Sequence, residues 1–235
     1  MADMAICCSA LRRMGQEAGS MEEAAERIVR YLYENLSGAG LKNPLALVRM
    51  FKTHAYGDLT EDLQAFAGRV LGRDPEASMK CLTMLATIGD RPQWCSRHLS
   101  NGHKAIPLAS EDGVRSIPMI AALIHQVGLE ISQVLKPDPG MLADLSQKTF
   151  NVFHVPDATD SPSVPAKQEF VNPEGIRSCL GFGGMMPHGD LFAVILFTRV
   201  PIPNDTANLF KSLSLSVKTA LLPFESTVFS DAVTV

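Results

Sequence analysis

The first clear pattern along the chain is an apolar stripe at helical spacing, which predicts a helix over residues 21–37. Ser20 and Glu23 have the spacing of a capping box at the start of this helix. The stripe consists of Ala25, Ile28, Val29, Leu32 and Leu36. Residues 2–16 are expected to form a preceding helix, and Gly38 and Gly40 mark the end of this region.

Short apolar runs and further helical stripes alternate through the middle of the chain. The runs predict strands over residues 45–54, 82–88 and 149–155. The stripes predict helices over residues 61–71 and 117–127, the second capped by Ser116, and a short helix over residues 139–147. The rest of the region from residue 129 to 175 is rich in proline and is expected to be irregular.

The strongest local signal is a pair of apolar, β-prone runs at residues 176–186 and 191–200, joined by a four-residue turn. Two such runs around a turn containing Gly189 predict an antiparallel hairpin. A last amphipathic helix is expected over residues 205–221, capped by Asn204 or Asp205. Its stripe comprises Leu209, Phe210, Leu213, Val217, Ala220 and Leu221. This order predicts an α+β fold with one central antiparallel sheet flanked by helices.

Composition narrows the class of protein further. With 46% hydrophobic residues in 235, the chain can build a substantial core, and its net charge of -4 comes without any basic run. Nucleic-acid binding depends on clustered Lys and Arg, so a nucleic-acid partner is not expected. The longest apolar run, residues 191–197, is far shorter than the roughly 20 residues that span a bilayer. The N-terminus lacks the pattern of a signal peptide, and five scattered cysteines do not fit a secreted disulfide framework. We therefore expect a cytoplasmic protein with no membrane partner.

The C-terminal third resembles the end of a GAF-type sensor domain. The resemblance rests on the segment from Gly175 to Gly183, the turn at His188-Gly189-Asp190, the run 191–197 and the helix that follows. Residues 20–224 are also similar to the N-terminal sensory region of bacterial two-component histidine kinases. This implies a domain organisation with an N-terminal extension at residues 1–19, one GAF-like domain at 20–224, and a tail or linker at 225–235.

The resemblance also implies how such a domain works. It implies a GAF/PAS-like sheet with a ligand cavity on one side, and N- and C-terminal helices packed together on the other. Those helices are expected to pair in a homodimer and to continue into an output domain such as a kinase. The helix at 61–71 and the long segment at 129–175 depart from a minimal GAF domain. The sequence signature of cyclic-nucleotide-binding members is missing, as is a bilin-attachment context, so the ligand is left open.

The loop after the second predicted strand concentrates polar chemistry. It contains Trp94, Arg97 and His103, and an indole face beside a guanidinium can hold an aromatic or anionic ligand. The alternative is a surface loop whose Trp only plugs the edge of the domain. Asn151 and His154, on a predicted strand, are further candidate ligand-binding residues. Arg177 is another, and its side chain either reaches a pocket or lies in solvent.

Metal and redox chemistry give the alternative interpretation. Cys95, His98 and His103 have part of a zinc spacing, without a second ligand pair. His154 and His125 are candidate haem ligands, although neither lies in a distinctive local motif. Cys81 and Cys95 invite comparison with GAF-fold methionine sulfoxide reductases, but Cys81 opens a strand expected to be buried, where a thiol is inert. We expect a non-catalytic ligand sensor. A haem, metal or redox protein is the second possibility, and a dimerisation platform without a ligand is the third.

Overall fold

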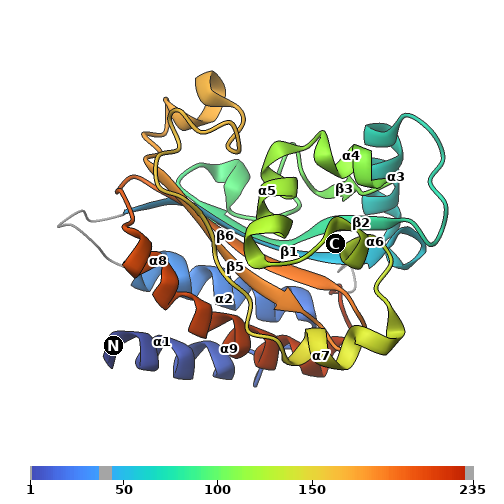
Figure 1. Ribbon diagram of the computed structural model, residues 1–235, viewed down its shortest axis with the longest axis horizontal. Coiled ribbons are helices and arrows are strands. Elements are labelled where there is room, and N and C mark those ends of the chain that lie inside the picture. The colour runs from blue at the N-terminus through green and yellow to red at the C-terminus, as the bar shows by residue number, and fades with distance from the viewer. Residues whose placement is uncertain (1, 37–43, 231–235) are drawn as a thin grey trace.

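The chain forms an α+β fold built on one six-stranded antiparallel sheet. The computed structural model describes residues 2–36 and 44–230, so Gly38, Gly40 and the end of the expected tail lie outside the described residues. Helices cover both faces of the sheet (Figure 1). The predicted architecture of a central antiparallel sheet flanked by helices is therefore confirmed.

The strands follow the spatial order β3-β2-β1-β6-β5-β4, and every neighbouring pair is antiparallel. The long central strands arise from the apolar runs, and β5 and β6 form the predicted hairpin with Ser178 opposite Thr198. Two outer strands differ from expectation, because β3 was not predicted and β4 is shorter than the run 149–155. The strands are β1 (Leu45–Ala55), β2 (Lys80–Gly89), β3 (Ala105–Pro107), β4 (Phe153–Val155), β5 (Ser178–Met185) and β6 (Leu191–Thr198).

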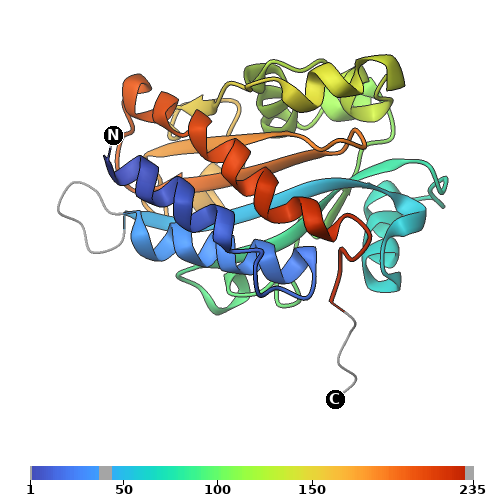
Figure 2. The ribbon, with the colours of Figure 1, turned by 90° about the horizontal axis from the view of Figure 1, so that it is seen from below.

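The terminal helices form a layer on one face of the sheet (Figure 2). This layer contains α1 (Ala2–Arg13), α2 (Met21–Asn35), α8 (Asn204–Leu209) and α9 (Lys211–Leu221). Helix α1 lies directly against α9: the thiol of Cys8 is 3.6 Å from the carbonyl oxygen of Ser212. A Cβ at Gly15 would lie 2.3 Å from the carbonyl oxygen of Ala220, so glycine is needed for this approach. The predicted packing of the N- and C-terminal helices is confirmed.

Helix starts follow the predicted caps only in part. Ser20 caps α2 by accepting a hydrogen bond of 3.1 Å from the amide of Glu23, as predicted. The cap of α5 is Ile117 instead of Ser116, whose hydroxyl donates to the carbonyl of Gly113 at the end of α4. The first residue of α8 is Asn204 and its cap is Pro203, so neither Asn204 nor Asp205 is the cap.

The closing helix is broken where one continuous helix was predicted. Helix α8 ends before Phe210, whose amide bonds back to Ala207, and α9 begins at Lys211. The break changes which side chains face the sheet. Leu213 is fully buried, whereas Leu209, predicted in the same stripe, is 42% exposed.

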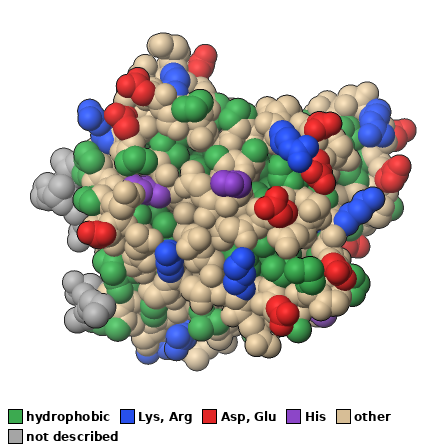
Figure 3. Space-filling view, viewed as in Figure 1, with side chains coloured by type: hydrophobic (Ala, Val, Ile, Leu, Met, Phe, Trp, Pro, Cys, Tyr) green, Lys and Arg blue, Asp and Glu red, His purple; other side chains and the backbone are tan. Residues whose placement is uncertain are grey.

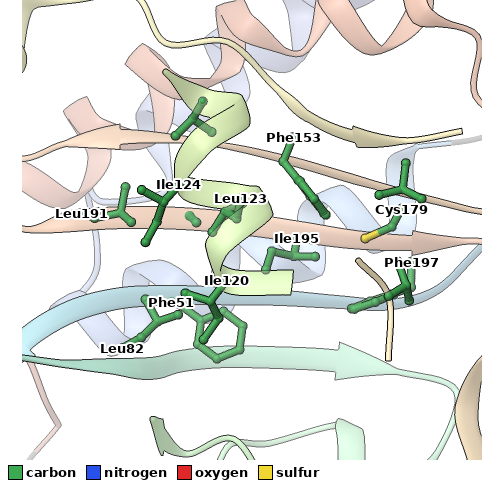
Figure 4. Close-up of a cluster of buried hydrophobic side chains, with 14 of the residues drawn as sticks. Phe51, Leu82, Ile120, Leu123, Ile124, Phe153, Cys179, Leu191, Ile195 and Phe197 are labelled. Atoms are coloured by element: carbon green, nitrogen blue, oxygen red, sulfur yellow. The ribbon is translucent and has the colours of Figure 1, made fainter. Parts of the chain in front are cut away.

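The opposite face of the sheet carries a second helical layer and the irregular segment 156–177. Helix α5 lies over the centre of the sheet, and Gly181 of β5 leaves room for Leu123, which is 3.2 Å from where a Cβ would be. Figure 4 shows Ile120, Leu123 and Ile124 directed from α5 toward apolar side chains of the strands. In the region 129–175, the short helix expected at 139–147 is present as α7 (Leu142–Gln147), and α6 (Ile131–Leu135) is a short helix that was not predicted. This layer comprises α4 (Glu111–Arg115), α5 (Pro118–Val127), α6 (Ile131–Leu135) and α7 (Leu142–Gln147).

Helix α3 (Glu61–Leu71) packs at the β2–β3 edge of the sheet through a small separate cluster that includes Leu63 and Cys81. In the part of the chain that the structure describes, no helix combines the length and apolar character required of a membrane span.

Candidate functional site

A cavity of about 590 Å³ lies between the sheet, the first half of α5, residues 164–170 and the loop from β2 to β3. We call that loop, residues 90–104, the cavity loop. The volume falls within the range typical of small-molecule sites. Most of the wall is apolar, and Figure 4 labels several of these side chains within the core cluster to which they belong. Its apolar side chains include Phe51, Leu82, Ile120, Leu123, Ile195 and Phe197.

Trp94 forms one wall of this cavity, as the sequence predicted for a ligand-binding residue. Its ring packs edge-on against Phe170 at 5.5 Å between centroids, and the guanidinium of Arg91 lies 5.3 Å from its centre. A Cβ at Gly89 would lie 2.9 Å from the indole, so the glycine at the end of β2 lets the ring approach the strand. The cation beside Trp94 is therefore Arg91 instead of Arg97.

His103 also lines the cavity. Its backbone is in the left-handed region, with φ of 62°, which turns the chain back into β3. The residue is exposed. The protein around it still lowers the pKa of His103, and the positive charge of Arg49 lowers this pKa further, so the ring is mainly neutral at pH 7.

Arg49 is the cavity residue that sequence reasoning missed. It lies in the middle of β1, between Ile195 of β6 and Thr87 of β2, and lines the cavity. Burial lowers the pKa of Arg49 to about 10, so the guanidinium stays charged at pH 7. The available signal was strand alternation, which places Arg49 on the same face of β1 as Leu47 and Phe51.

Arg97 does not line the cavity, and its side chain instead holds parts of the fold together. Its side chain is 4% exposed and its Nε donates to the carboxylate of Glu22, which is equally buried. A second carboxylate, that of Asp62, lies 3.6 Å away. The guanidinium also lies 5.3 Å from the ring centre of Phe229. Arg97 therefore joins the cavity loop to α2 and to the C-terminal segment, by which we mean residues 225–230.

The other three candidate ligand-binding residues do not line the cavity. Asn151 is exposed near the C-terminal end of α5, where its backbone amide donates to the carbonyl of Val127 at 3.2 Å. His154 pairs with Leu180 in the sheet, and its Nδ1 is 2.9 Å from the side-chain oxygen of Asn204. Arg177 is exposed, and its amide donates to Thr198 at 2.7 Å. The structure thus brings together Trp94 and His103 but neither of the predicted arginines.

The weak metal candidates are spread over the surface. Cys95 is exposed, with its thiol 3.5 Å from backbone carbonyls, and His98 is 3.5 Å from Glu22. His125 is exposed on α5. No cluster of three or more His, Cys, Asp or Glu side chains suited to a metal is found among the described residues. Cys81 is fully buried, and burial raises its pKa to about 11, as the sequence predicted for an unreactive thiol.

A second polar cluster lies at the other end of the central strands. Asp190, in the β5–β6 turn, accepts hydrogen bonds of 2.7 Å from both Lys52 and Lys80. Burial alone would raise the pKa of Asp190, but the two ammonium groups hold it below its usual range. Nearby His54 is 5% exposed, and neither ring nitrogen has a hydrogen-bond partner within the described chain. Burial, followed by the charge of Lys52, lowers the pKa of His54 to about 3.

Charge on the surface is mixed. Figure 3 shows Lys and Arg interspersed with Asp and Glu on the face seen in Figure 1, without a concentrated basic region.

Comparison with protein-family models gives no match, and comparison with curated protein sequences gives none.

Proposed function

We propose that the protein is a ligand-sensing regulatory domain of the GAF type, in which the cavity binds a small molecule. The observation that carries the proposal is the cavity itself, about 590 Å³ of mostly apolar space into which polar groups of β1 and the cavity loop converge. The division of the sheet into a cavity face and a face covered by terminal helices supports the GAF assignment. A cytoplasmic location and a downstream output domain, such as a kinase, belong to the same proposal.

The cavity loop provides a route from the ligand to the chain termini. Trp94 and His103 line the cavity, whereas Arg97, between them, binds Glu22 at the start of α2 and contacts Phe229. The backbone amides at the start of α2 also donate to the C-terminal segment at 2.8–2.9 Å. A ligand that favours one position of the loop therefore changes the packing of both terminal regions.

Filling the cavity is expected to abolish binding. Ile120→Trp places a larger side chain in the cavity wall, and the neutral fluorescent probe N-phenyl-1-naphthylamine measures occupancy of the apolar space. We expect wild-type protein to bind the probe and to show a raised Tm with at least one member of a metabolite library. Both responses should be lost in Ile120→Trp and retained in Ile6→Trp, which changes an exposed isoleucine on α1.

Hydrogen exchange tests whether binding is transmitted. A ligand found in this screen should change exchange in the C-terminal segment as well as in the cavity loop. Binding without any change outside the cavity would contradict a sensing role, and a wild-type protein that binds neither probe nor metabolite would contradict the proposal as a whole.

The proposed homodimer uses the outer surface of α1 and α9, which lie side by side (Figure 2). Ile6 is 65% exposed and Leu215 is 61% exposed, so this surface presents large apolar side chains to solvent. The apolar stripe of α2 is buried against the sheet and is not available to a partner, contrary to expectation. Leu213 is also in the core, so its substitution would report on folding instead of assembly.

We expect Leu215→Glu to halve the molar mass measured by light scattering, because a carboxylate would be buried in the interface. Val70→Glu, at a 55%-exposed position on α3, is the matched control and should leave the dimer intact. A wild-type protein that is monomeric at all concentrations would rule out this assembly.

A further inference from the structure

The cavity contains a positive charge that has no counter-charge among the described residues. Arg49 is half-buried and takes part in no hydrogen bond or ion pair among the described residues, and its Nε is fully buried without a partner. A buried charge without a counter-charge is costly, so buried arginines are normally paired. Because Arg49 lines an open cavity, a ligand can supply the missing partner.

The neighbouring polar groups do not already fill this role. Arg91 is paired with Glu174, and His103 is mainly neutral because desolvation by the surrounding protein and the charge of Arg49 lower its pKa. Glu169, the acidic residue that lines the cavity, is exposed and forms no ion pair with Arg49 within the described chain. Among the described residues that line the cavity, Arg49 is therefore a cation that forms no ion pair.

A second unpaired group lies beside this charge. Thr87 is directly opposite Arg49 in the β1–β2 pair, and directly paired residues point to the same face of a sheet. Its hydroxyl oxygen is buried and has no hydrogen-bond partner within the described residues. Arg49 and Thr87 thus lie side by side on one face of the sheet. Arg49 lines the cavity together with Leu47, Phe51 and Phe197, whereas Thr87 lies next to the lining and is not part of it.

We propose that the ligand is an organic monocarboxylate with an apolar body, bound with its carboxylate on Arg49. The inference rests on the proposed function, in which this cavity is the ligand site. A guanidinium matches a carboxylate in a bidentate geometry, and one negative charge satisfies Arg49 without leaving an excess. A phosphate dianion would bring a second charge that the cavity does not neutralise. The apolar walls then bury the rest of the molecule.

A matched series of ligands tests the carboxylate directly. The probes are 4-phenylbutanoate, 4-phenylbutanamide and 4-phenylbutylammonium, which share one apolar body and differ in the charged end. Trp94 is the only tryptophan of the chain, so its fluorescence reports on the cavity, and calorimetry gives Kd. We expect wild-type protein to prefer the carboxylate to the amide by about 10- to 100-fold, the usual strength of a hydrogen bond to a charged group.

The variant Arg49→Met removes the charge while keeping an apolar side chain of similar length. It should remove the preference for carboxylate and leave the affinity for the amide unchanged. Arg49→Lys, which retains the charge without the fork, should keep part of the preference, and it serves as the test if Arg49→Met fails to fold. Arg177→Met, at an exposed arginine outside the cavity, should behave as wild type.

The outcomes separate the two proposals. Equal affinity for carboxylate and amide, or an unchanged preference in Arg49→Met, overturns the carboxylate assignment and leaves the cavity as a ligand site. Failure of all three compounds to bind while N-phenyl-1-naphthylamine binds overturns it too. If N-phenyl-1-naphthylamine does not bind either, the proposed function is overturned.

Discussion

Arg97→Met is expected to lower the free energy of unfolding by about 3–5 kcal/mol, the usual cost of breaking a buried ion pair by removing one partner. The carboxylate of Glu22, which is 4% exposed in the intact protein, would keep only a hydrogen bond of 3.1 Å from the amide of Ser230 and a contact of 3.5 Å with His98. Urea denaturation monitored by circular dichroism measures the loss.

Two further variants test whether the broken ion pair causes this loss of stability. The double variant Glu22→Met/Arg97→Met removes both charges and should recover most of the stability, since apolar side chains can replace a buried pair. Arg115→Met removes an arginine that is 56% exposed and paired with Glu111, so no measurable change is expected. If Arg97→Met costs no more than Arg115→Met, the buried pair does not stabilise the fold.

His54 is expected to make the protein acid-sensitive. The ring has a pKa of about 3 in the folded protein, because it is buried and next to Lys52, whereas the unfolded chain has a histidine pKa near 6.5. At pH 7 the ring is neutral in both states. Between pH 6.5 and pH 3 the unfolded chain takes up a proton that the folded protein does not, so acid favours unfolding. From pH 7 to pH 4.5 this contribution amounts to about 3 kcal/mol.

His54→Leu should remove that part of the acid sensitivity and lose correspondingly less stability over the same pH interval. The comparison uses urea denaturation at both pH values, so that other titrating groups cancel between the two proteins. His125→Gln, at an exposed histidine, should retain the wild-type pH dependence. Parallel pH profiles for wild type and His54→Leu would show that the folded protein accommodates a charged ring at this position.

The sequence predicted the elements whose pattern is long and regular. The stripe of α2, the hairpin of β5 and β6 and the central strands all follow from local periodicity. It did not predict β3 or the true length of β4, because a strand of three residues is defined by the neighbour that it pairs with. The break at Phe210 was missed for a similar reason, since tertiary packing outweighs the continuous helical pattern.

The cavity was predictable only in part. Trp94 and His103 stood out because they are unusual residues in a polar loop, and loops on a rigid scaffold often carry binding groups. Arg97 lies in the same loop but turns toward Glu22, and a linear pattern does not reveal which way a loop side chain turns. The sequence does not single out Arg49, because its run is rich in apolar residues, although alternation places one charged side chain on the inner face of the strand.

Both outermost strands, β3 and β4, are only three residues long. An exposed strand edge is a template on which another chain can add by backbone hydrogen bonding, and short edge strands offer few unpaired groups for that purpose. The sheet is thus poorly suited to stacking end to end with other copies or to capturing an extended peptide. At β3 and β4, recognition of a partner therefore depends on side chains more than on backbone pairing.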